Sequence, residues 1–216
     1  MQSRNLSPTV DYITRTFVHE PAWLAPVRAE GNQRRPGMQV SPYEGYLLHW
    51  LLRISGARCV LEIGSFVGYS TLWMAEALPA DGHLTTLEFA VDHAALAKAH
   101  VAASPHAARV TVEQGDAHAW LAAEPCAPTY DFVFIDAEKT GYADYLDAVL
   151  PRMNPRGWII GDNSLLFGVM TGENSEGSSA AAKAAMTRFN ETLADATRFE
   201  SILLPTAEGL TIARMK

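Results

Sequence analysis

Residues 61–70 join a short apolar run to a helical segment through two glycines: Leu61-Glu62-Ile63-Gly64-Ser65-Phe66-Val67-Gly68-Tyr69-Ser70. A glycine at each end lets the backbone turn tightly and lets a ligand approach it closely. Glu88 closes the next apolar run, roughly twenty residues beyond Gly68, where a carboxylate binds ribose hydroxyls in doubly wound folds. The stretch therefore predicts a turn that binds a nucleotide-type cofactor.

Two cofactors, NAD and S-adenosylmethionine (SAM), fit such a turn. The dinucleotide fingerprint has a further glycine that brings the backbone against the pyrophosphate, whereas larger residues fill positions 65–67 here. Glu62 stands inside the apolar run, where the ammonium group of a methionine moiety would satisfy its carboxylate. These details favour SAM. The alternatives are an NAD-dependent oxidoreductase, a non-catalytic SAM-binding protein, and a plain tight turn with Glu62 exposed at the sheet edge.

Short apolar runs alternate with helical segments from Gly56 onward, which predicts an α/β fold with a doubly wound, mostly parallel sheet. The last two runs are too close in sequence to be parallel neighbours, so the final strand is expected to be antiparallel. The seven predicted strands are Cys59–Ile63, Leu84–Leu87, Val110–Val112, Phe132–Ile135, Trp158–Ile160, Phe199–Leu204 and Leu210–Arg214. Between the fifth and sixth, the Gly/Ser/Asn-rich stretch Gly168–Ser179 indicates a linker or a mobile loop, and we favour the loop because the stretch begins shortly after the expected metal ligands.

We expect a single domain over residues 1–216, with a helical preface at 1–55 and an α/β core at 56–216. One helix is predicted from Ser7 to Val18. A second begins near Ser41-Pro42, where Glu44 completes a capping box. Prolines and glycines interrupt the stretch between these two helices.

Composition excludes some partners. The net charge of −7 and the pI near 5.5 speak against binding to nucleic acid or to an anionic membrane. No signal-peptide core and no stretch of about 20 apolar residues is present. Cys59 and Cys126 both lie in or beside apolar segments, so we expect core thiols, a reducing compartment and a cytoplasmic protein.

Oxygen-bearing side chains follow two of the predicted strands. Asp136 closes one strand, and Asp162 and Asn163 close the next. Neighbouring parallel strands lie roughly 4.8 Å apart, so these side chains can converge on one hard cation. Mg²⁺, Mn²⁺ and Ca²⁺ all fit, whereas the absence of His and Cys from both runs speaks against zinc. Taken one at a time, each of these residues is also explained as a helix cap or a turn residue.

Three further residues each have a functional and a structural interpretation. Lys139 is the one lysine beside this predicted cleft, which makes it a candidate proton acceptor, although alone it reads as a surface charge. Ser70 begins the helix after the glycine turn, where it binds a carboxylate or is an ordinary first-turn serine. Asp116 accepts from an adenine amino group, caps the following helix, or does both.

Taken in order, these runs resemble the cation-dependent, class I SAM-dependent O-methyltransferases, the group that contains catechol O-methyltransferase and caffeoyl-CoA O-methyltransferase. The resemblance extends from about Gly37 to the C-terminus. Its carriers are Met38-Gln39-Val40-Ser41, Leu61-Glu62-Ile63-Gly64, Gly68-Tyr69-Ser70, Glu88, Asp136-Ala137-Glu138-Lys139, Gly161-Asp162-Asn163, Leu204-Pro205 and Gly209-Leu210-Thr211. It implies the Rossmann-like fold of SAM methyltransferases.

The resemblance also implies the roles of individual residues. Lys139 becomes the general base, with Asp136 in the catalytic set, and Asp136, Asp162 and Asn163 become ligands of Mg²⁺. Dimerisation through the N-terminal helices is common in the group. The residues implied to bind SAM are Met38, Val40, Glu62, Gly64, Ser65, Phe66, Gly68, Ser70, Glu88, Asp116, Ala117 and Asp136.

The expected acceptor is a small vicinal diphenol of the catechol type, methylated on one hydroxyl. A cation that binds both oxygens would favour the phenolate, because a phenol has a pKa near 10 in water. The sequence departs from its relatives around the acceptor. Pro36 and Glu138 stand where the animal catechol enzyme has aromatic residues, and the Trp that plant acyl-CoA enzymes carry after the Asn163 position is absent, so an acyl-CoA acceptor is not supported.

Overall fold

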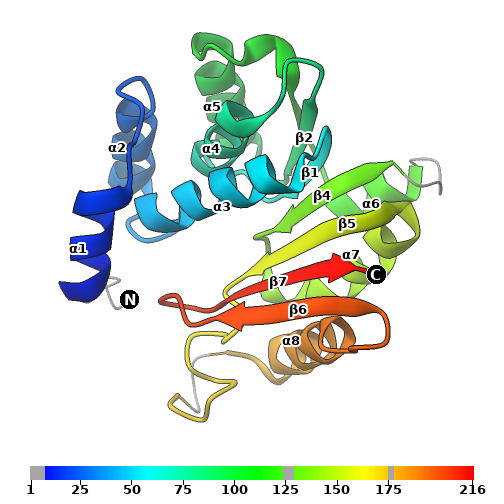
Figure 1. The fold of residues 1–216 in the computed structure, drawn as a ribbon. Coiled ribbons are helices and arrows are strands. Elements are labelled where there is room, and N and C mark those ends of the chain that lie inside the picture. Colours follow the sequence, from blue (N-terminus) through cyan, green and yellow to red (C-terminus); the bar gives the residue numbers. More distant parts are fainter. Residues whose placement is uncertain (1–7, 124–128, 175–177) are drawn as a thin grey trace. The chain divides into compact units, whose positions relative to one another are not determined.

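The computed structural model describes residues 8–123, 129–174 and 178–216, which divide into two compact units. Of the described residues, the first unit comprises 8–58 and 65–115, and the second comprises 59–64, 116–123, 129–174 and 178–216. The sheet order is β3-β2-β1-β4-β5-β7-β6, with seven strands, and each unit contains both helices and strands (Figure 1). This is the α/β class expected from the sequence.

The first unit contains five helices of the described chain and one pair of strands. β2 and β3 are parallel, with Leu84 opposite Val110 and Glu88 opposite Gln114. The elements in chain order are α1 (Pro8–Phe17), α2 (Ala25–Arg34), α3 (Pro42–Ser55), α4 (Tyr69–Ala77), β2 (His83–Glu88), α5 (Val91–Ala103), a 3-10 turn (Ala107–Arg109) and β3 (Val110–Gln114).

The second unit holds the other five strands. β1, β4 and β5 are parallel, whereas β7 is antiparallel to both β5 and β6, which confirms the prediction of one antiparallel strand. The elements are β1 (Cys59–Ile63), α6 (Ala117–Ala123), β4 (Tyr130–Ile135), a 3-10 turn (Lys139–Gly141), α7 (Tyr142–Val149), a second 3-10 turn (Leu150–Arg152), β5 (Met153–Asp162), α8 (Ala180–Leu193), β6 (Phe199–Leu204) and β7 (Leu210–Met215).

Helix α2 was not predicted, because its glycine and proline were read as interruptions. Pro26 lies in the first turn, where its missing N–H costs nothing. Gly31 is buried and closely packed, since a Cβ there would lie 2.1 Å from Gln39 Oε1 and 3.0 Å from Val67 Cγ2. By contrast the capping box at α3 is confirmed: Ser41 Oγ accepts from the Glu44 N–H at 3.2 Å, and the Glu44 carboxylate accepts from the Ser41 N–H at 2.8 Å.

One prediction about the core was wrong. Cys59 is exposed rather than buried, because it is the first residue of β1 and only the following residues of that strand enter the core. Its backbone N–H donates to the Asp131 carboxylate at 2.9 Å. Cys126 lies outside the described residues.

The segment between β5 and α8 forms a series of turns through residue 174, and part of the predicted Gly168–Ser179 loop, residues 175–177, lies outside the described chain. Leu166 and Phe167 both have positive φ angles, of 50° and 56°, which bulky residues rarely adopt. Within the described ranges, no helix has the length and apolar character needed to cross a membrane.

Gly64 is expected to be the least replaceable turn glycine. Its φ is +98°, and an added Cβ would lie 2.1 Å from the backbone oxygen of Asp136. We predict that Gly64→Ala lowers the free energy of unfolding by roughly 3 kcal/mol, because left-handed strain and overpacking add. Gly56→Ala is the matched control: its φ is +67° but nothing lies within 4 Å, so a loss of about 1 kcal/mol is expected. Urea unfolding gives both values, and equal losses would contradict the prediction.

Candidate active site

The ends of β4 and β5 bring together the acidic residues expected to form a site. Ile135 of β4 is opposite Gly161 of β5 in a parallel pairing, and Asp136 and Asp162 each come directly after these partners. Asp162 is fully buried and the next residue, Asn163, is 4% exposed. We call Asp136, Asp162 and Asn163 the acidic strand ends.

Lys139 contacts the acidic strand ends from the 3-10 turn that follows β4. Its Nζ lies 3.1 Å from Asp136 Oδ1 and 2.8 Å from the hydroxyl of Tyr142. The Lys139 side chain is 14% exposed and the Asp136 side chain 18%. The amine therefore has two fixed partners and a limited opening to solvent.

Tyr142, the first residue of α7, was missed by the sequence analysis. It is fully buried, and its hydroxyl lies 3.0 Å from the carbonyl oxygen of Ile135 and 2.8 Å from that of Asp162. Since a phenol has one proton and carbonyls only accept, the hydroxyl donates to the strand ends and accepts from Lys139. Burial, followed by the charge of Asp136, raises the pKa of Tyr142 well above its ordinary value, which keeps the donor protonated. The spacing Lys139-x-x-Tyr142 is the signal that could have indicated it.

Asn163 has features that fit a cation ligand. Its φ of 55° lies in the left-handed region, which Asn adopts more readily than most residues. Its buried Nδ2 has no hydrogen-bond partner among the described residues, and exchanging the amide nitrogen and oxygen would present an acceptor there.

The acidic strand ends supply too few ligands to surround a metal ion by themselves. The described chain contains no group of three or more His, Cys, Asp or Glu side chains suited to a metal. The acidic strand ends supply two carboxylates and one amide, so a hard cation bound there would need water or substrate oxygens as well.

Glu138 lies beside two aromatic residues. Its Oε1 accepts from the Tyr145 hydroxyl at 2.7 Å and lies 3.9 Å from His118 Nε2. The His118 ring stacks on Tyr145 with centroids 4.2 Å apart. Burial and the bond to Glu138 raise the pKa of Tyr145, so this phenol also stays protonated.

The predicted cofactor residues divide between the two units. In the first unit, the Glu88 carboxylate accepts from the backbone N–H of Phe66 at 2.7 Å and from that of Ala90 at 2.9 Å. A carboxylate has further lone pairs, so Glu88 is still able to accept from ribose hydroxyls. Ser65 Oγ is buried and, among the described residues, has no hydrogen-bond partner, which fits a polar ligand at the turn.

Further predicted residues of the first unit lie near the helix that follows the turn or before α3. Gly68 is the N-cap of α4 and offers no side-chain cap, so the first N–H groups of that helix suit a carboxylate. Ser70, in its first turn, is buried. Val40 is buried as well, whereas Met38 is 37% exposed.

In the second unit, Glu62 is fully buried, so the alternative of an edge-exposed Glu62 was wrong. Asp116 Oδ1 accepts from the Ala119 N–H at 2.8 Å, which confirms that Asp116 caps α6. Ala117 is buried at the start of that helix.

Comparisons with known proteins decide the family. The profile of the O-methyltransferase family matches residues 15–216. The chain belongs to this O-methyltransferase family. It is 33% identical to a catechol O-methyltransferase of Niastella koreensis over 95% of both chains.

Two solved O-methyltransferases share the fold. TomG of Streptomyces achromogenes, in complex with SAM, is 31% identical, has a TM-score of 0.85 and covers 100% of this chain and 99% of its own. An O-methyltransferase of Bacillus cereus, in complex with SAH, is 31% identical, has a TM-score of 0.84 and covers 95% and 96%. This protein is therefore a SAM-dependent O-methyltransferase, and the oxidoreductase alternative is set aside.

Tyr142→Phe tests the hydroxyl that joins the strand ends to Lys139. We predict a loss of about 1–3 kcal/mol in the free energy of unfolding, because buried carbonyls lose their donor. The methyl-transfer rate should fall about tenfold as Lys139 loses one of its two partners. Tyr145→Phe, which removes only the bond to Glu138, is expected to cost less than about 1 kcal/mol. Denaturant unfolding and initial rates measure both, and equal effects of the two variants would refute the role of Tyr142.

Proposed function

We propose that this O-methyltransferase transfers the methyl group of SAM to one hydroxyl of a small vicinal diphenol and depends on a divalent cation. The observation that carries the proposal is the position of Lys139, held by Asp136 and Tyr142 at the ends of two parallel strands. Because two partners fix the Lys139 amine, it is oriented to accept a proton from one direction. The neighbouring acidic residues offer oxygen ligands for a cation.

Asp136, Asp162 and Asn163 are the residues that would hold the cation. Mg²⁺ is our first choice, with Mn²⁺ and Ca²⁺ as candidates for the same oxygen donors. A bound dication would lower the pKa of a coordinated phenol and orient the diol. The buried Asn163 amide and the places of Asp136 and Asp162 directly after two paired strand residues support this assignment.

Lys139 is the proposed general base. As a neutral amine it has two N–H groups, which donate hydrogen bonds to Asp136 and Tyr142. Its one lone pair remains to take the proton of the acceptor hydroxyl. After the proton is transferred, the ammonium keeps both bonds and gains the attraction of the Asp136 carboxylate. The acceptor oxygen then attacks the methyl carbon of SAM, and SAH leaves.

The residues assigned to SAM follow the same logic. Glu88 would accept from the ribose hydroxyls, and the N-terminus of α4 with Ser70 would bind the carboxylate of the methionine moiety. Glu62, fully buried, would meet its ammonium group, and Asp116 with Ala117 would border the adenine. Met38, Val40, Gly64, Ser65, Phe66 and Gly68 complete the set.

Chelation and lysine variants test this mechanism together. We predict that EDTA abolishes methylation of catechols and that Mg²⁺ restores it, because the diol loses its oxygen-binding cation. Lys139→Met should lower kcat about a hundredfold or more, the range of a lost general base, while SAH still binds. Lys183→Met removes an exposed lysine of α8 and should change nothing.

The readout is methyl transfer to a panel of vicinal diphenols and monophenols. Full activity in EDTA would contradict the proposed dependence on a divalent cation. A wild-type rate in Lys139→Met would contradict the role of Lys139 as general base.

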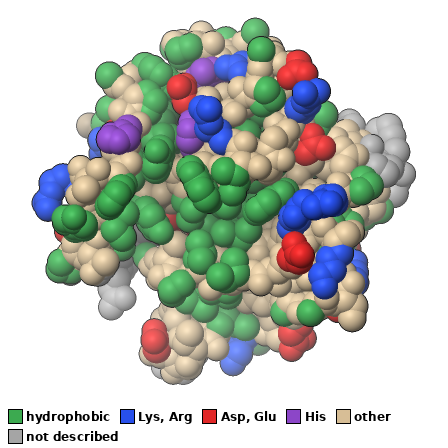
Figure 2. Space-filling model, in the orientation of Figure 1, with side chains coloured by type: hydrophobic (Ala, Val, Ile, Leu, Met, Phe, Trp, Pro, Cys, Tyr) green, Lys and Arg blue, Asp and Glu red, His purple; other side chains and the backbone are tan. Residues whose placement is uncertain are grey.

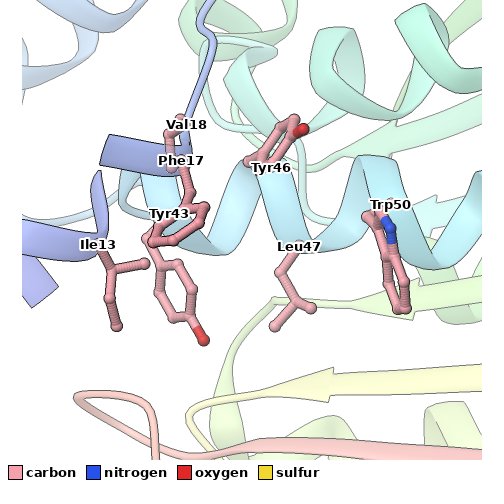
Figure 3. Close-up of a pocket in the computed structure, with 7 residues that line it drawn as sticks. All are labelled: Ile13, Phe17, Val18, Tyr43, Tyr46, Leu47 and Trp50. Atoms are coloured by element: carbon pink, nitrogen blue, oxygen red, sulfur yellow. The ribbon is translucent and has the colours of Figure 1, made fainter. Parts of the chain in front are cut away.

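We also propose that the protein forms a homodimer through α1 and α3. No residue of α1 is buried, although apolar residues recur along it. Together with α3 and Val18, α1 lines a groove of about 190 Å³, and Ile13, Tyr43, Leu47 and Trp50 extend to the same side of the two helices (Figure 3). Apolar side chains are also visible at the surface in Figure 2, and Phe17, Trp50 and Ile54 are each more than half exposed. A second copy of the chain would cover this apolar side.

Trp50→Glu tests the dimer. The wild-type protein is expected to have twice the 23.6 kDa mass of one chain in light scattering, and the variant to be a monomer, because a charge replaces apolar contact area. Ile202→Glu is the control, since Ile202 is equally exposed but lies on β6. A monomeric wild type, or dissociation by the control alone, would contradict the proposed interface.

A further inference from the structure

We infer that His100 is a positioning residue for the cofactor turn: it fixes the Val67 carbonyl and so maintains the backbone conformation that binds SAM. The inference rests on the proposed function, because it takes the turn around Phe66 to be part of the SAM site. His100 lies on α5, outside the turn, and the sequence analysis gave it no role.

The turn has a backbone that needs support. Phe66 has a φ of 51° and Gly68 one of 89°, and a bulky residue such as Phe66 adopts the left-handed region only at a cost in free energy. Two side chains hold this strained segment. Glu88 accepts from the Phe66 N–H at 2.7 Å, and His100 Nδ1 lies 2.8 Å from the carbonyl oxygen of Val67.

The second nitrogen of His100 has its own partner. Nε2 lies 3.0 Å from Glu30 Oε2 of α2, and the imidazole side chain is 16% exposed. A carbonyl and a carboxylate only accept hydrogen bonds, so both contacts are satisfied when both ring nitrogens donate. The bond from His100, with a further one from Arg34, lowers the pKa of Glu30 and keeps its carboxylate ionised. The ring is therefore fixed at both ends.

Both helices that contribute to this link also pack directly on the turn. A Cβ on Gly31 of α2 would lie 3.0 Å from Val67 Cγ2, and a Cβ on Gly68 would lie 3.5 Å from Ala97 of α5. Val67 itself is fully buried. This packing keeps the protein folded without the imidazole, so loss of His100 is expected to release the Val67 carbonyl and loosen the local backbone of the turn rather than to unfold the protein.

The two nitrogens can be tested separately. An Asn amide nitrogen takes the place of Nδ1, and a Gln amide nitrogen takes the place of Nε2. His100→Asn therefore keeps the donor to Val67 and loses Glu30, whereas His100→Gln keeps Glu30 and loses Val67. His100→Ala loses both. His83→Ala, which removes an exposed histidine bonded to Thr111, is the control.

Calorimetric titration with SAH and steady-state kinetics measure the effect. We expect His100→Ala and His100→Gln to raise the Kd for SAH and the KM for SAM about fivefold to tenfold, the size of one hydrogen bond. His100→Asn and His83→Ala should stay within about twofold of wild type. kcat at saturating SAM should be unchanged in all four, and thermal melting should show that each is folded.

Several results would overturn the inference. These are wild-type SAH affinity in folded His100→Ala, an effect of His100→Asn as large as that of His100→Ala, or a fall in kcat at unchanged KM. Glu88→Ala separates failure of the inference from failure of the proposed cofactor site. If Glu88→Ala weakens SAH binding and His100→Ala does not, only the role of His100 fails; if Glu88→Ala binds SAH as the wild type does, the assignment of the turn fails.

Discussion

The buried hydroxyl of Tyr142 is the interaction on which the geometry of the acidic strand ends depends. It lies within hydrogen-bonding distance of the last carbonyl of β4 and of the carbonyl of Asp162, and it accepts from Lys139. One buried polar group thus joins two strand ends and the lysine. Because Tyr142 begins α7, the packing of that helix also determines where the lysine amine lies. The full burial of the ring prevents water from competing for these bonds.

A second constraint connects this edge of the sheet to the glycine turn. The Asp136 N–H donates to the Ile63 carbonyl at 2.9 Å, and the backbone of Asp136 fills the space that a side chain at Gly64 would need. The residue that begins the turn is therefore fixed against the residue that contacts Lys139. In the proposed reaction this matters because the methyl donor and the proton acceptor have to keep a defined geometry, and small displacements are costly in rate.

The sequence predicted the features that depend on local chemistry and strand order. The capping box at Ser41, the single antiparallel strand and the neighbouring ends of β4 and β5 follow from spacing and residue type. It failed where the deciding contact comes from residues outside the helix in question. Gly31 reads as a helix breaker until Gln39 is found beside it, and Tyr142 reads as an ordinary core residue until the two strand ends meet at its hydroxyl.

Glu138 shows why the methyl acceptor is harder to predict from the sequence than the methyl-transfer reaction. Gly141 leaves room for its carboxylate, since a Cβ there would lie 2.3 Å from Glu138 Oε1, and the Tyr145 hydroxyl then fixes that oxygen. The Glu138 side chain is 56% exposed, so its charge stays hydrated. A flat apolar substrate ring that stacked on Glu138 would remove water from its carboxylate, which costs free energy. The same ring stacked on an aromatic side chain at position 138 would make a favourable contact. Under the proposed function, the acidic strand ends and Lys139 would determine the chemistry, whereas Glu138 would give the acceptor ring surroundings that differ from an aromatic wall.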